Sequence, residues 1–162
     1  MNIALLTPSY NLMKKGYGSK IKIRGGLYPP LGLAYLASPL INDGHKVKII
    51  DASSYEYTNK KIGDILLEFK PDLIGISSVT ASAEESYSLA NYLKSKFGQV
   101  PLVYGGHHAN CFPEMVFSNI KDLDLLFCGE AELTFREAVI FYEKKGRLPQ
   151  DLQSTWAKKD GQ

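Results

Sequence analysis

The hydrophobic residues of this chain fall into five short and almost uninterrupted runs. These runs cover residues 3–6, 47–50, 73–76, 102–104 and 123–127. Four runs stop at a polar residue or at glycine, and the fifth stops at Cys128-Gly129. Runs this apolar are typical of strands covered on both faces, as in a parallel sheet.

The segments between the runs have the pattern of helices. Residues 31–43 follow two prolines and end before Gly44, a residue suited to the position after a helix. Apolar residues recur three and four positions apart in 62–69, and further helices are expected over 81–97, 113–119 and 135–142. This alternation predicts a doubly wound α/β domain. Five parallel strands favour the flavodoxin-like order 2-1-3-4-5.

Composition narrows the class of protein. The 162 residues suit one domain, which we place at 1–146, and the polar, unpatterned residues 147–162 are expected to be a linker toward an absent catalytic domain. With 19 basic and 17 acidic residues, the net charge of +2 gives no argument for a nucleic-acid or membrane partner. No apolar run approaches the roughly 20 residues that span a bilayer, and no secretory signal is present, so we expect a cytoplasmic protein.

The two cysteines, Cys111 and Cys128, are too few for a disulfide framework. No local spacing of cysteine or histidine matches a zinc or iron–sulfur site. We therefore expect two reduced thiols and no metal held by these cysteines.

Small residues gather where three of the expected strands end. In sheets of this kind, ligands bind outside the carboxyl ends of the strands. The residues that follow the third, fourth and fifth strands are Ser77, Ser78 and Thr80, then Gly105, Gly106 and His107, then Gly129 and Glu130. Glycines and small hydroxyl residues keep the rim of a site low, so a bulky flat ligand can reach the backbone. These eight residues are the predicted cofactor-binding site.

Each of these features also has a structural explanation. Glycine after a strand is often a turn former, and Thr80 or Ser82 is equally suited to cap the following helix. A histidine near a turn is more often a hydrogen-bonded structural residue than a catalyst, so neither His107 nor His108 is assigned a catalytic role. The segment 8–30 carries five basic residues and no acidic one, as solvated loops often do. The phosphate-binding glycine motifs are not in the sequence.

The strand-end motifs resemble the cobalamin-binding domain of radical S-adenosylmethionine enzymes. The resemblance runs through roughly residues 1–145 and is carried by Pro29-Pro30-Leu31-Gly32-Leu33-Ala34-Tyr35-Leu36-Ala37, Gly44-His45-Lys46-Val47, Pro71-Asp72-Leu73-Ile74-Gly75-Ile76-Ser77, Gly105-Gly106-His107-His108-Ala109 and Gly129-Glu130-Ala131-Glu132. Ala131 stands where the family usually has glycine. The D-x-H-x-x-G loop that supplies a cobalt-ligating histidine in other cobalamin proteins is not in the sequence, and neither is the C-x-x-x-C-x-x-C motif of the radical barrel.

The resemblance implies that this domain binds cobalamin, with the dimethylbenzimidazole tail off cobalt and buried in the sheet and with no protein histidine in its place. Ser77 would contact the base of the tail, and Thr80 would line the same slot. Gly105 and Gly106 would pass close to the nucleotide loop, with Gly129 and Glu130 on its far side. S-adenosylmethionine and an iron–sulfur cluster would belong to a radical catalytic domain, a methyltransferase or an oxidative cyclase, in the same or a partner chain.

Two other functions remain open from the sequence. The same fold without a cofactor would serve as a substrate- or partner-docking domain. An independent nucleotide-binding enzyme would use the same crevice, although the phosphate loops it would need are missing. In the first of these, as in the cobalamin hypothesis, the chain alone is not expected to turn over a substrate.

Overall fold

The computed structural model describes residues 1–9 and 29–157, and within them the chain forms a six-stranded sheet in the order β2-β1-β3-β4-β5-β6. The first five strands are parallel and have the predicted order. The strands are β1 (Asn2–Thr7), β2 (Lys46–Asp51), β3 (Leu73–Ser77), β4 (Leu102–Gly105), β5 (Leu125–Phe127) and β6 (Thr155–Trp156).

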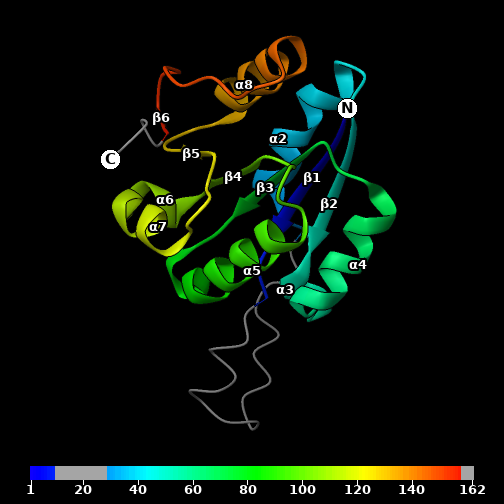
Figure 1. Ribbon diagram of the computed structural model, residues 1–162, viewed down its shortest axis with the longest axis vertical. Coiled ribbons are helices and arrows are strands. Elements are labelled where there is room, and N and C mark those ends of the chain that lie inside the picture. Colours follow the sequence, from blue (N-terminus) through cyan, green and yellow to red (C-terminus); the bar gives the residue numbers. More distant parts are fainter. Residues whose placement is uncertain (10–28, 158–162) are drawn as a thin grey trace, which may run out of the picture.

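Helices cover both faces of the sheet (Figure 1). They are α2 (Leu31–Asn42), α3 (Ala52–Tyr55), α4 (Asn59–Phe69), α5 (Ala83–Lys96), α6 (His107–Cys111), α7 (Pro113–Asn119) and α8 (Glu132–Lys145), with a 3-10 turn at Thr80–Ser82 before α5. The helices α2 and α8 lie on one face, and α4, α5 and α7 lie on the other. None of the helices in these residues is long and apolar enough to cross a membrane.

Alternation along the strands divides the core into two layers. In β1, Ile3 and Leu5 pack toward α2 and α8, whereas Ala4 and Leu6 pack toward α4 and α5. The other parallel strands follow the same rule, because successive side chains of a strand point to opposite faces. Position within a strand therefore decides which helix layer each strand-end residue faces.

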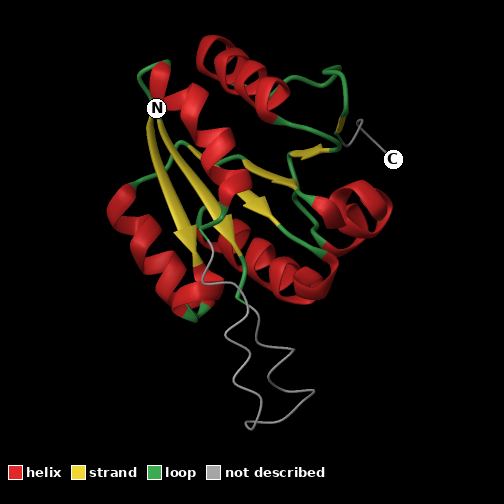
Figure 2. Cartoon of the chain, turned by 180° about the vertical axis from the view of Figure 1, so that it is seen from behind, coloured by secondary structure: helices red, strands yellow, loops and turns green. Residues whose placement is uncertain are grey.

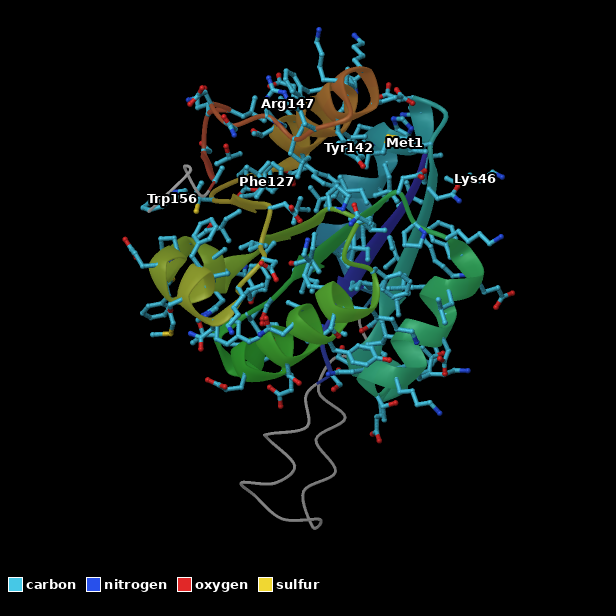
Figure 3. All side chains as sticks on the ribbon, viewed as in Figure 1. Met1, Lys46, Phe127, Tyr142, Arg147 and Trp156 are labelled. Atoms are coloured by element: carbon cyan, nitrogen blue, oxygen red, sulfur yellow. The ribbon has the colours of Figure 1, made fainter. Side chains whose placement is uncertain are left out.

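The structure corrects the predicted strand number. The sequence predicted five strands, but β6 pairs antiparallel with β5, and Figure 3 shows Phe127 and Trp156 on these two strands. The preceding segment also packs on the sheet, with Leu148 and Leu152 against the α2–α8 layer. A strand of two residues has no period that a sequence pattern could reveal. The division into a domain at 1–146 and a linker at 147–162 stays a prediction, although residues 147–157 contact the sheet.

Short helices were also missed. The helix α3 follows directly on β2 because the carboxylate of Asp51 caps it, accepting a hydrogen bond from the Ser54 amide. The helix α6 begins after Gly106, whose φ of 97° and ψ of −177° lie in a region that is essentially restricted to glycine. The cartoon in Figure 2 shows both sheet and helices from behind.

Candidate cofactor-binding site

A groove opens on the α2–α8 face of the sheet, at the carboxyl end of its central strands. The empty space in it is about 370 Å³, counting the part that is open to solvent. The floor is formed by β1, β3 and β4, and the walls by the first turns of α2 and α8. The lining residues are Leu5, Leu33, Leu36, Gly75, Ile76, Ser77, Val103, Tyr104, Gly105, Gly106, Phe127, Ala131 and Phe135.

Strand register explains why the floor is low. Gly75 pairs with Leu5 on one side and Val103 on the other, and Ser77 pairs with Gly105. Gly75 and Ser77 are two residues apart on β3, and Gly105 is the β4 partner of Ser77, so all three lie on the same face of the sheet. Three positions where a larger side chain would stand carry only hydrogen or a small hydroxymethyl group.

Gly75 is the tightest of these positions. A Cβ atom at Gly75 would lie 3.0 Å from Cδ2 of Leu5 and 3.5 Å from Cγ2 of Val103. Glycine inside a strand often marks a close approach of a ligand or another backbone. Gly75 was not among the predicted site residues, because in the sequence it stands inside the apolar run of the third strand rather than after it.

Ser77 is the polar side chain of the groove. The groove is otherwise lined by apolar side chains and glycine backbone, apart from the strand residue Tyr104. The Tyr104 hydroxyl lies away from the groove, 2.6 Å from the hydroxyl of Ser86 on α5. Within the described part of the chain, the Ser77 hydroxyl has no hydrogen-bond partner, so it is available to a ligand.

Of the eight predicted residues, the groove brings together Ser77, Gly105 and Gly106. Ser78 points to the opposite layer, and its hydroxyl donates to the Val79 carbonyl and lies 3.1 Å from the hydroxyl of Ser82. The strand alternation explains this, since neighbouring residues face opposite sides. Ser82 ends up as the residue before α5, but its hydroxyl makes no capping hydrogen bond.

Thr80 and His107 stand outside the groove. Thr80 is exposed, and its Oγ1 lies 3.3 Å from Nδ1 of His108 rather than against the slot we expected it to line. His107 is exposed at the first position of α6.

Gly129 and Glu130 lie at the rim, beyond the lining residues, and both are exposed. The Gly129 amide donates to Oδ1 of Asn110, 2.7 Å away, and this bond ties the β5 end to α6. The neighbouring Ala131 does line the groove. The basic side chains predicted at Lys14, Lys15, Lys20, Lys22 and Arg24 lie outside the described residues.

The ends of β1 and β2 are joined beside the groove by Asp51. Its Oδ1 accepts hydrogen bonds from the hydroxyls of Thr7 at 2.9 Å and Ser53 at 2.6 Å, and its Oδ2 accepts one from Ser54 at 2.5 Å. Partial burial raises the pKa of the Asp51 carboxyl, but the hydrogen bonds from Ser53, Ser54 and Thr7 outweigh it and leave that pKa below its usual value. Asp51 is therefore ionised at neutral pH and fixes this edge of the sheet.

Replacing Asp51 with asparagine should destabilise the chain by about 1 kcal/mol at pH 7, since it removes a charged cap that is only partly buried. A carboxyl whose pKa is lowered on folding stabilises the native state above its unfolded pKa and loses that contribution as pH falls through the folded value. The difference between wild type and Asp51→Asn should thus shrink below about pH 4. Urea unfolding at pH 7 and pH 3 measures it, with exposed Asp122→Asn as control. An equal difference at both values would contradict the assignment.

No group of three or more histidine, cysteine or acidic side chains that could hold a metal ion occurs in the described ranges. Cys111 and Cys128 are free thiols. Burial raises the pKa of Cys128, whose Sγ lies 3.6 Å from the Ala109 carbonyl, and this makes it less reactive.

Comparison with known proteins identifies the family. The family model for the B12 binding domain matches residues 21–139. The match covers most of the chain and includes every residue of the groove except Leu5. The chain belongs to the B12-binding domain family.

The similar curated proteins are methyltransferases and cyclases. An uncharacterized methyltransferase, PH0819, of Pyrococcus horikoshii is 38% identical over 118 residues, which are 73% of this chain and 26% of that protein. The cytidylyl-2-hydroxyethylphosphonate methyltransferase of Streptomyces wedmorensis is 32% identical, over 65% of this chain and 23% of that protein. The anaerobic magnesium-protoporphyrin IX monomethyl ester cyclase of Synechocystis is 29% identical, over 91% of this chain and 29% of that protein. The chain thus spans about a quarter of the length of these relatives.

A solved structure shares the fold. The cobalamin-dependent S-adenosylmethionine radical enzyme OxsB, with aqua-cobalamin and S-adenosylmethionine bound, superposes with a TM-score of 0.76 at 21% identity. The likeness covers 99% of this chain and 21% of that chain. It confirms the flavodoxin-like fold that the sequence predicted.

Proposed function

We propose that this chain binds cobalamin with the dimethylbenzimidazole tail inserted in the groove between α2 and α8. The observation that carries the proposal is the groove itself, whose floor over Gly75 and Gly105 lacks side chains. A flat bicyclic base needs apolar walls and a hydroxyl partner for its ring nitrogen, because a buried unpaired nitrogen is costly. Leu33 and Phe135 supply the walls, and Ser77 supplies the hydroxyl.

The remaining predicted residues have secondary roles in this proposal. Gly105 and Gly106 bring backbone close to the nucleotide loop, with Gly129 and Glu130 at the outer rim. Ser78, Thr80 and His107 act by shaping the loops rather than by touching the base. Bound cobalamin would supply methyl-transfer or electron-transfer chemistry, and the chain would orient it and shield its lower face.

The chain would serve as the cofactor-binding module of a larger radical S-adenosylmethionine methyltransferase or cyclase. Its relatives support this because they are about three times as long as this chain and include enzymes of both classes. S-adenosylmethionine and an iron–sulfur cluster would then be bound by a separate catalytic domain. The chain by itself would have no turnover.

The direct test mixes the purified chain with hydroxocobalamin and separates them by gel filtration. We expect the corrinoid absorbance to elute with the protein. A protein fraction without corrinoid would overturn the proposal and leave the docking function, whereas retention of ATP or NAD in a parallel run would favour a nucleotide site.

We further propose that no histidine of this chain occupies the lower position of cobalt. The sequence has three histidines. His45 precedes β2 at the far end of the strands, and the ring of His108 bonds to Tyr87 and Thr80, which leaves His107 to be tested.

The electron paramagnetic resonance spectrum of bound cob(II)alamin should show no splitting from an axial nitrogen, and His107→Ala should leave that spectrum unchanged. Nitrogen splitting in the wild type that His107→Ala removes would identify His107 as a ligand and contradict the proposal. Splitting that survives in His107→Ala would indicate that the tail remains on cobalt.

A further inference from the structure

The histidine that matters to the groove is the buried His108, whereas the sequence analysis predicted His107 as a cofactor-binding residue. His108 is 1% exposed and lies behind the groove, on the opposite layer of the sheet. Its Nε2 lies 2.5 Å from the hydroxyl of Tyr87 on α5, and its Nδ1 lies 3.3 Å from Oγ1 of Thr80. Both ring nitrogens thus have partners, and this fixes the orientation of the ring.

The same residue joins two loops through its backbone. The segment from the end of β3 into the following turn (residues 77–80) and the segment from the end of β4 into α6 (residues 105–108) lie side by side. The His108 amide donates to the Ser78 carbonyl at 3.1 Å, and the Ser78 amide donates to the Gly105 carbonyl, also at 3.1 Å. The separation of these loops sets the distance between Ser77 and Gly106 in the groove.

The imidazole is held in its neutral form. Burial lowers the pKa of His108, while the nearby carboxylate of Glu84 raises it less. Burial also raises the pKa of Tyr87 to about 12, so that its hydroxyl stays protonated. The Phe112 ring lies 5.3 Å from the imidazole and covers it on another side.

We infer that His108 is a positioning residue for the groove, holding the β3 and β4 loops in register through Tyr87 and Thr80 so that the Ser77 hydroxyl meets the base of the corrinoid tail. This inference rests on the proposed function. The cost of burying a polar ring is offset here by bonds to α5 and to the β3 loop, which an apolar residue of the same size would not make.

The test compares two corrinoids, hydroxocobalamin and dicyanocobinamide, which lacks the nucleotide tail. Tyr87→Phe and Thr80→Val each remove one hydroxyl and keep the side-chain shape. Each should weaken hydroxocobalamin binding roughly three- to tenfold, the worth of one hydrogen bond, and leave cobinamide binding within about twofold. Tyr92→Phe is the matched control, because this part-buried α5 hydroxyl lies 3.4 Å from Nζ of Lys96, next to Gly63 of α4, and is not among the groove or loop residues, so its loss should not affect either ligand.

His108 variants complete the experiment. His108→Leu should reduce the affinity for hydroxocobalamin relative to cobinamide at least as much as Tyr87→Phe or Thr80→Val does, whichever has the larger effect. His108→Asn can still form a hydrogen bond to Thr80, so its affinity for hydroxocobalamin should be partly restored. If His108→Leu does not fold, Tyr87→Phe and Thr80→Val are sufficient to test the inference. The inference would be overturned if the variants bound both corrinoids equally more weakly, or bound both as the wild type does. In either case, binding of hydroxocobalamin by the wild type would still support the proposed function. Wild-type chain that binds neither corrinoid would overturn both.

Discussion

The chain with Ser77 replaced by phenylalanine is expected to lose at least about 100-fold in affinity for hydroxocobalamin. A bicyclic base of roughly aromatic side-chain size buries about 150 Å² of surface, worth about 4 kcal/mol at 25 cal/mol per Å². A phenylalanine ring from Ser77 would occupy that space over Gly75 and remove the hydroxyl as well. Losing two thirds of this free energy of binding lowers the affinity about 100-fold.

Fold and affinity can be separated in this experiment. The groove is open to solvent, so the new ring has space and the thermal midpoint should change little. Cobinamide, which has no tail, should bind as it does to the wild type. Ser95→Phe places the same ring on the exposed surface of α5, far from the groove, and should bind both corrinoids normally. Unchanged hydroxocobalamin affinity in Ser77→Phe would show that the tail lies elsewhere.

The sheet could be predicted from sequence because its strands carry a strong signal. A buried parallel strand has apolar residues on both faces, and four of the five expected runs agree closely with the observed strands. The fifth begins later than expected, at Leu125, because the preceding Asp124 accepts a hydrogen bond from the Leu102 amide at 2.7 Å through its side chain. β6 and α6 escaped prediction because each depends on contacts from distant parts of the chain.

The sequence predicted the end of the sheet at which the groove lies, but only three of its eight lining candidates face that groove. The rule that ligands bind at the carboxyl ends of strands pointed to the segments after β3 and β4, and Ser77, Gly105 and Gly106 from them line the groove. Strand alternation, applied from Gly75 to Ser77, would also have separated Ser77 from Ser78. The same step would have brought Gly75 into the site.

Only the structure shows that His107 is exposed and His108 is buried. His107 and His108 are adjacent and chemically identical, and nothing in the sequence says which is buried. The answer depends on where α6 begins, and that depends on the backbone of Gly106. A buried polar residue is thus identified by its partners, Tyr87 and Thr80, which lie more than 20 residues away in sequence.

Gly106→Ala is the substitution from which we expect the largest loss of stability. At a φ of 97° and ψ of −177° an alanine is strained by roughly 1–3 kcal/mol. Its Cβ would also lie 2.6 Å from the Ser78 carbonyl oxygen and 2.8 Å from the Ser77 hydroxyl oxygen. Two of the close atoms belong to the Ser78 backbone, which cannot rotate away, so this overlap adds a further cost of about 1–3 kcal/mol.

Comparison with Gly44→Ala separates the cost of backbone strain from the cost of steric overlap. Gly44 has a φ of 87°, but a Cβ there would meet no atom within 4 Å, so its variant should show backbone strain alone, about 1–2 kcal/mol. Denaturant unfolding of both variants gives the difference, and we expect Gly106→Ala to be the less stable by roughly 1–3 kcal/mol. Relief of the overlap would also move the loops after β3 and β4 apart. Hydroxocobalamin affinity should therefore fall in Gly106→Ala and not in Gly44→Ala. Equal stability of the two variants would mean that the segments after β3 and β4 are not in close contact at Gly106.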